Sequence, residues 1–189
     1  MIFMNIEKLI AELRKVTGKI SKANVNRFLQ VIKKANRVYV MGEGRSGLVA
    51  KSFAMRLARL GKIVYVVGET VTPAVGENDL LIAISGSGET KTVLETVKIS
   101  RVMRAKVVCL TASPDSPLTK LSHLVIVIPA QLPKRLGNIY QLRELIGVPE
   151  RPPQASMFEL ASLMFLEVTA FNLEKYWQTK NKPVKLLPS

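Results

Sequence analysis

Residues 80–90 read Leu80-Leu-Ile-Ala-Ile-Ser-Gly-Ser-Gly-Glu-Thr90, an apolar run that changes abruptly into small and hydroxyl-bearing residues. Five consecutive apolar residues are typical of a strand buried on both faces. The apolar spacing that follows predicts a helix from Glu89 to about Arg104. A strand that passes through a short loop into a helix is the building unit of a parallel α/β sheet.

Strands and helices of the same kind extend outward from this stretch in both directions. Further strands are predicted at 38–41, 63–67, 106–111 and 124–128, and further helices at 6–13, 28–35, 49–60 and 157–176. Strands that are apolar throughout and alternate with helices indicate a parallel sheet covered by helices on both faces. The chain is therefore predicted to have an α/β fold.

The 189 residues are expected to form a single domain, 1–189, with four parts. These parts are N-terminal helices at 1–36, an α/β core at 37–130, an irregular excursion at 131–153, and a C-terminal helix with its tail at 154–189. Five prolines between 129 and 153 weaken the periodicity of the excursion, where one short helix is expected at 139–146.

The composition is unusual in its basic charge, with a formal net charge of +14. Nine basic residues stand against two acidic ones in the first 40 residues. Charge alone does not choose between nucleic acid and a small anion. The sequence has no aromatic RNA-binding stretch, no clear recognition helix and no zinc-ligand spacing. Solvated Lys-rich helix faces are therefore favoured, and neither a nucleic-acid partner nor a metal site is expected.

Three features that the sequence lacks predict the cellular location of the chain. No uninterrupted apolar run approaches the roughly 20 residues that span a bilayer. The N-terminus, 1–15, lacks the apolar core of a signal peptide. The one cysteine, Cys109, cannot form an internal disulfide. A reducing, cytoplasmic location and no membrane partner are expected.

The loop at 85–90 has the properties that a phosphate needs. Its two glycines let the backbone approach a ligand closely, and its three hydroxyls are donors. The start of the following helix directs free N–H groups and a positive dipole end at an anion. A helix N-cap with turn glycines would require only one of these hydroxyls. We therefore predict that the loop binds phosphate, and the absence of a Gly-Lys-Ser/Thr ending excludes a Walker loop.

A second strand-to-helix loop, Gly42-Glu-Gly-Arg-Ser-Gly47, is expected at the same edge of the sheet. Its glycines match the dinucleotide pattern G-x-G-x-x-G, and Glu69 could be the acidic ribose anchor. Arg45 and Ser46 indicate a different ligand, because both side chains can bond sugar hydroxyls. A dinucleotide-dependent oxidoreductase is thus a secondary possibility.

Together the two loops resemble the sugar isomerase (SIS) domain family. The resemblance is closest to its 6-phospho-3-hexuloisomerase members. It rests on Gly44-Arg-Ser-Gly47, Phe53-Ala-Met-Arg-Leu57, Val67-Gly-Glu-Thr70 with Pro73, and the stretch at 80–90. It is strong over 38–130, resumes at Ser156-Met-Phe-Glu159, and covers about two thirds of the chain.

The resemblance implies a three-layer α-β-α sandwich with a five-stranded parallel sheet of flavodoxin or Rossmann type, assembled as a homotetramer. It also implies a phosphorylated sugar as ligand and a reaction without a cofactor, the interconversion of D-arabino-3-hexulose 6-phosphate and D-fructose 6-phosphate through an enediol, as in the ribulose monophosphate pathway. The implied substrate-binding residues are Gly44, Arg45, Ser46, Ser85, Gly86, Ser87, Gly88, Glu89 and Thr90, and the implied base is Glu159.

Glu159 also has a simpler interpretation. Ser156-x-x-Glu159 matches a capping box that would open the last helix just after Pro152-Pro153. An isomerase needs a group that removes a proton beside a carbonyl and returns it to the neighbouring carbon. The resemblance favours that base role for Glu159, and the two roles are compatible.

The sequence departs from the hexuloisomerases in three places. Pro183 stands where their C-terminal tail has a histidine, the segment 134–153 is longer, and Ala155 replaces a glycine. The only histidine, His123, is expected to be a surface or loop residue before a strand. A non-catalytic sugar-phosphate sensor, or an isomerase of arabinose 5-phosphate or of a heptose phosphate, are the alternative functions.

Overall fold

The computed structural model of the chain describes residues 6–132 and 154–180, and for Gln154, Ala155, Thr179 and Lys180 it describes the backbone alone. The helices are α1 (Ile6–Thr17), α2 (Lys22–Lys34), α3 (Gly44–Arg59), α4 (Lys91–Val102), α5 (Pro117–Leu121) and α7 (Gln154–Lys180). The strands are β1 (Arg37–Gly42), β2 (Ile63–Val66), β3 (Leu80–Ile84), β4 (Lys106–Thr111) and β5 (Leu124–Val127).

The five strands form one sheet in the order β2-β1-β3-β4-β5, and every neighbouring pair is parallel. The central strand β3 is buried along its whole length. Helices cover both faces of the sheet, which explains why β3 carries no polar side chain. The predicted α/β fold with a five-stranded parallel sheet is therefore confirmed.

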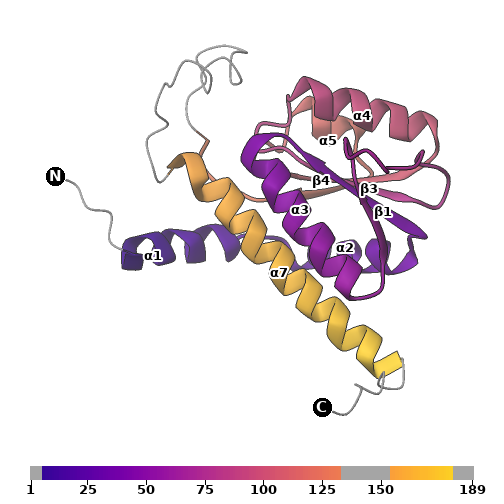
Figure 1. The fold of residues 1–189 in the computed structure, drawn as a ribbon. Coiled ribbons are helices and arrows are strands. Elements are labelled where there is room, and N and C mark those ends of the chain that lie inside the picture. The colour runs from indigo at the N-terminus through magenta and orange to yellow at the C-terminus, as the bar shows by residue number, and fades with distance from the viewer. Residues whose placement is uncertain (1–5, 133–153, 181–189) are drawn as a thin grey trace.

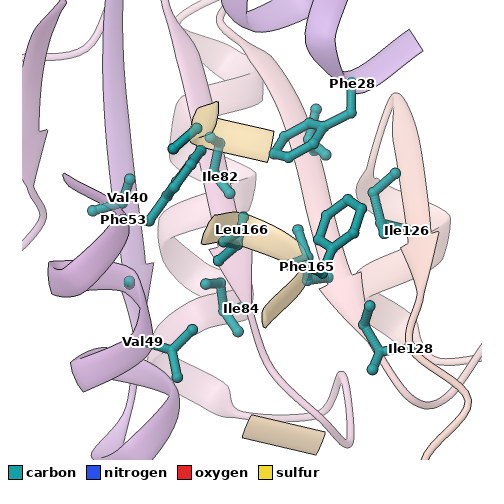
Figure 2. Close-up of a cluster of buried hydrophobic side chains, with 14 of the residues drawn as sticks. Phe28, Val40, Val49, Phe53, Ile82, Ile84, Ile126, Ile128, Phe165 and Leu166 are labelled. Atoms are coloured by element: carbon teal, nitrogen blue, oxygen red, sulfur yellow. The ribbon is translucent and has the colours of Figure 1, made fainter. Parts of the chain in front are cut away.

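Two hydrophobic clusters lie on the two faces of the sheet. Alternate strand residues such as Val40, Ile82 and Ile126 pack with α2, α3 and α7, while their neighbours in sequence pack with α4 and α5. Figure 1 shows α3 and α7 side by side on one face, with α4 and α5 on the other. Figure 2 shows the first cluster, in which the rings of Phe28 and Phe165 stack with their centroids 5.8 Å apart.

Helix α7 is longer and more apolar than its neighbours. By length and composition alone, Ser156–Gln178 would suffice to cross a membrane. The expectation from the sequence missed this stretch, because it considered only uninterrupted apolar runs. A core helix of a globular protein meets the same criterion of length and composition. Half of an 18-residue window within this stretch is buried, and α7 packs against α1, α2 and α3.

The helices differ from the predicted ones in their starts and in one addition. Helices α2, α3 and α7 begin three to six residues earlier than their apolar spacing predicted, at Lys22, Gly44 and Gln154. Helix α4 begins at Lys91, because Glu89 and Thr90 still belong to the preceding loop. The short helix α5 was not predicted, and it starts with Pro117, a residue favoured in the first helical turn. Most of the excursion, including the helix expected at 139–146, lies outside the described residues, as does the tail beyond Lys180.

Candidate functional site

The order in which strands are added to the sheet reverses at one point, between β1 and β3. Helix α3 follows β1 onto one face and leads to β2, whereas α4 follows β3 onto the other face and leads to β4. In an open α/β sheet such a reversal leaves a crevice at the carboxyl edge of the strands, where ligands bind. The pairing of Gly42 with Ile84 brings the two predicted loops next to each other at this edge.

The loop after β3 is held together by its own hydroxyl groups. The hydroxyls of Ser85 and Thr90 lie 2.9 Å apart and share a hydrogen bond. The Gly88 amide donates to Ser85 Oγ at 3.1 Å, and the Glu89 amide donates to Ser87 Oγ at 3.3 Å. All three predicted hydroxyl residues therefore gather in one turn, with Ser85 buried and Glu89 exposed.

The hydroxyls of this loop do not cap α4. Thr90 occupies the N-cap position, but its side chain makes no capping hydrogen bond and instead contacts Ser85. The first turn of α4 also contains no acidic side chain. A helix start with no side-chain cap and no acidic residue of its own presents N–H groups and a positive dipole end, which suit an anion. The simpler N-cap interpretation of the loop is therefore not supported.

The loop rests on the strand β4 and the residues that follow it. The carbonyl oxygen of Gly86 accepts hydrogen bonds from the Ala112 amide at 2.9 Å and from Thr111 Oγ1 at 3.0 Å. The Leu118 amide donates to the carbonyl oxygen of Gly88 at 3.1 Å. Sequence reasoning missed this support, because nothing marked Thr111, the last residue of β4, as a partner of the loop.

The two glycines of the loop have close neighbours, and Gly88 is the more constrained of the two. Gly88 has a φ of +65°, and a Cβ atom there would lie 2.1 Å from Ser116 Oγ. A Cβ atom on Gly86 would lie 3.1 Å from side-chain atoms of both Leu132 and Phe158. A side chain at Gly88 is therefore excluded by both backbone and space, whereas one at Gly86 would require Leu132 and Phe158 to move by a few tenths of an ångström.

The glycines after β1 bring the strand end against the first turn of α3. A Cβ atom on Gly42 would lie 2.7 Å from backbone atoms of Ser46, and one on Gly47 would lie 2.8 Å from the Gly42 carbonyl oxygen. Strand-to-helix packing thus accounts for these two glycines of the G-x-G-x-x-G match. Glu69, the possible ribose anchor, pairs with Lys51 of α3 at 2.6 Å.

Arg45 joins the first loop to the predicted base. Its Nη1 donates to Ser156 Oγ at 2.8 Å, and its Nη2 lies 3.7 Å from Glu159 Oε2. Glu159 is partly buried, with 19% of its side chain exposed, and its Oε2 atom is inaccessible to solvent. Gly44, with a φ of +53°, opens this turn of α3, and Ser46 is buried beside Arg45.

The capping-box interpretation of Ser156 and Glu159 is wrong. Helix α7 already begins at Gln154, so Ser156 lies inside the first turn and not at the N-cap. Its hydroxyl accepts from Arg45. Sequence reasoning gave Ser156 a role as a possible cap and a place in the motif at 156–159, but not its contact with Arg45.

His123 lies away from these loops. It is exposed, precedes β5, and its Nδ1 accepts a hydrogen bond from the Val107 amide at 2.9 Å, near the amino ends of β4 and β5. The expectation of a surface or loop residue is confirmed. The three positions that depart from the hexuloisomerases, Pro183, 134–153 and the side chain of Ala155, lie outside the described residues.

Comparison with known proteins gives this site a family. The family model of the SIS domain matches residues 31–141. The 3-hexulose-6-phosphate isomerase of Bacillus subtilis is 32% identical over 168 residues, which are 89% of this chain and 86% of that protein. An uncharacterized protein of Aeropyrum pernix is 34% identical, over 98% of this chain and 93% of its own length.

A solved structure agrees with these relatives. It belongs to a hypothetical protein of Methanococcus jannaschii for which a function of 3-hexulose-6-phosphate isomerase was inferred, and it superposes with a TM-score of 0.72 at 27% identity. The match covers 96% of this chain and 97% of that one. From its domain model, its relatives and its fold, this chain belongs to the SIS domain family.

Proposed function

We propose that the chain is a sugar-phosphate isomerase that interconverts D-arabino-3-hexulose 6-phosphate and D-fructose 6-phosphate without a cofactor. Family membership and relatives that carry the name 3-hexulose-6-phosphate isomerase support this reaction. The observation that carries it in this molecule is the contact of Arg45, in the loop after β1, with both Ser156 and Glu159 of α7.

In this proposal the phosphate occupies the loop at 85–90. The hydroxyls of Ser85, Ser87 and Thr90 donate to its oxygens, and the uncapped start of α4 stabilises its charge. The carbon chain then extends along the crevice toward the loop after β1. Ser46 and Arg45 contact the sugar there, and the carbon atoms that react lie beside Glu159.

Glu159 moves one proton between two neighbouring carbons. Toward fructose 6-phosphate, its carboxylate takes the proton from C2, the C–H electron pair forms the C2=C3 double bond, and the C3 carbonyl pair moves onto O3. The proton returns to C3, while the O2 hydroxyl proton is transferred to O3 and C2=O forms. The Arg45 guanidinium, 3.7 Å from the Glu159 carboxylate, stabilises the negative charge of the enediolate.

A coupled assay tests the reaction directly. The protein is mixed with D-arabino-3-hexulose 6-phosphate, and fructose 6-phosphate is detected by its conversion to glucose 6-phosphate and then by NADP reduction. We expect continuous formation of fructose 6-phosphate. If micromolar protein forms none, the proposed reaction is wrong. The same assay format with arabinose 5-phosphate and a heptose phosphate determines whether another sugar is the substrate.

A further inference from the structure

Glu43 is an exposed acidic residue just beyond the carboxyl end of β1, and the local structure of α3 does not explain its presence. It holds the N-cap position of α3 with extended backbone angles, but its side chain makes no capping bond. Good N-caps are Ser, Thr, Asp and Asn, whose short side chains reach the helix amides. The Glu43 carboxylate turns away from α3 and accepts a hydrogen bond from Thr92 Oγ1 at 2.7 Å.

This hydrogen bond crosses the crevice between the two loops. Because Gly42 pairs with Ile84, Glu43 and Ser85 are the first residues beyond the paired ends of β1 and β3. Thr92 lies in the first turn of α4, on the opposite side of the crevice from α3. A molecule held by the loop at 85–90 at one end and by Arg45 at the other therefore lies next to the Glu43 carboxylate.

The charge of Glu43 restricts what it can bind there. Without a ligand, its carboxylate lies near the positive end of α4, where a negative charge is stabilised. A bound phosphate carries more negative charge than the carboxylate and occupies the start of α4 in its place. The phosphate and the Glu43 carboxylate then repel each other. The carboxylate then needs neutral donors close to the phosphate, and the hydroxyls of a sugar chain are such donors, because ionised acceptors form the stronger hydrogen bonds.

We propose that Glu43 is a specificity-determining residue, whose carboxylate leaves Thr92 and accepts hydrogen bonds from the hydroxyls of the bound phosphosugar. This inference rests on the proposed function, since it takes the crevice to be the phosphosugar site. Glu43 thus distinguishes a polyhydroxylated phosphate ester from phosphate itself and from esters without hydroxyls.

Three probes of the full chain test this role by calorimetry: fructose 6-phosphate, butyl phosphate and inorganic phosphate. Replacing Glu43 with Ala removes the acceptor, and we expect the Kd for fructose 6-phosphate to rise about tenfold or more. The Kd values for butyl phosphate and inorganic phosphate stay within about twofold or fall, because a negative charge has been removed. Thr92→Val is the matched control, since it breaks the same hydrogen bond but leaves the carboxylate.

The possible outcomes distinguish direct contact between Glu43 and the sugar from an indirect effect through its hydrogen bond with Thr92. If Glu43→Ala leaves fructose 6-phosphate binding unchanged, or weakens all three probes equally, the proposal is wrong. It is also wrong if Thr92→Val reproduces the selective loss, because Glu43 would then act through the hydrogen bond alone. The proposed function fails on a different result, namely the absence of turnover by the unaltered protein, so the two failures are distinguishable.

Discussion

Glu159 is the residue on which the proposed proton transfer depends. Replacing it with Gln removes the base but keeps the size of the side chain. We expect turnover to fall by about 100-fold or more, while the Kd for fructose 6-phosphate changes little, because the phosphate loop is untouched. The coupled assay measures turnover, and calorimetry measures the Kd.

The chain contains a matched control for this variant. Glu167, also on α7, pairs with Arg56 of α3 at 2.7 Å, as Glu159 pairs with Arg45 near the start of both helices. Glu167→Gln should therefore leave turnover unchanged. Full activity of Glu159→Gln, or an equal loss in both variants, would contradict a base role for Glu159.

Gly88 combines a left-handed backbone with a close neighbour. In Gly88→Ala the new Cβ would overlap Ser116 Oγ, so the loop must shift and lose its hold on phosphate. Gly61→Ala is the comparison, because Gly61 has a φ of +79° with nothing within 4 Å of the added atom. Gly61→Ala should cost about 1–2 kcal/mol of unfolding free energy, and Gly88→Ala should cost more and also abolish phosphate binding.

Urea unfolding and calorimetry with inorganic phosphate measure these two effects. Equal stability losses, together with normal phosphate binding in both variants, would show that the contact with Ser116 has no influence on the loop.

Residues near each other in the chain were the predictable part of the candidate site. The loop hydroxyls and glycines lie within six positions, so their spacing alone indicated a phosphate site. The Arg45–Ser156 contact joins residues 111 positions apart, and the Thr92–Glu43 contact joins residues 49 positions apart. Such pairs arise from the way α3, α4 and α7 meet, which no local pattern contains.

At the scale of elements, His123 makes the junction of β4 and β5 sensitive to pH. The side chain of His123 is exposed, yet partial desolvation of its ring lowers its pKa below the ordinary 6.5, and nearby Arg101 and Lys106 lower it further. The unfolded chain therefore binds a proton at a higher pH than the folded one. The stabilisation is fully present above pH 6.5 and is lost as the pH falls through the lowered pKa of the folded state.

Urea unfolding between neutral and mildly acidic pH measures this effect. We expect the free energy of unfolding to decrease below pH 6.5. His123→Asn keeps an acceptor for the Val107 amide but does not titrate, so it should flatten the decrease. An identical pH profile for this variant would mean that other groups cause the decrease.

Elements could be predicted from the sequence to the extent that they bury apolar residues in a regular pattern. All five strands were found, because runs such as Leu80–Ile84 are apolar throughout. Helix α5 was missed because it has only five residues and buries only Leu118, too little to produce a periodic signal. The starts of α4 and α7 were displaced by two or three residues, because loop hydroxyls and prolines near a helix resemble caps. The starts of α2 and α3 were placed five or six residues too late, because their first turns hold few large apolar residues.

At the scale of the whole molecule, the reactivity of Cys109 measures how often the core around β4 opens to solvent. It is fully buried in β4, and burial raises the pKa of its thiol to about 11. We expect a thiol reagent such as DTNB to react very slowly with the native protein at pH 8, and rapidly once urea unfolds it. Fructose 6-phosphate should slow the reaction further, because a ligand that binds only the folded state stabilises it. Rapid labelling of native protein would contradict this picture.

The assembly state is a second property of the whole molecule. The homotetramer implied by the resemblance stays a prediction. The outer sides of α3 and α7 expose the apolar residues Leu48, Met55, Met164, Val168 and Phe171, a composition compatible with burial between subunits. Light scattering coupled to size-exclusion chromatography measures the mass, and a mass near the 20.9 kDa of one chain would contradict the tetramer.

The position of α7 affects how the chain folds during synthesis. This helix covers the face that α2 and α3 share, yet the ribosome makes it after every other described element. Until it emerges, Phe28, Phe53 and their neighbours lack their cover, and the nascent chain is a natural client for chaperones. Because α7 also brings Glu159, the proposed base, an incomplete chain has the loop at 85–90 but lacks that residue, and we expect activity only once α7 covers this face.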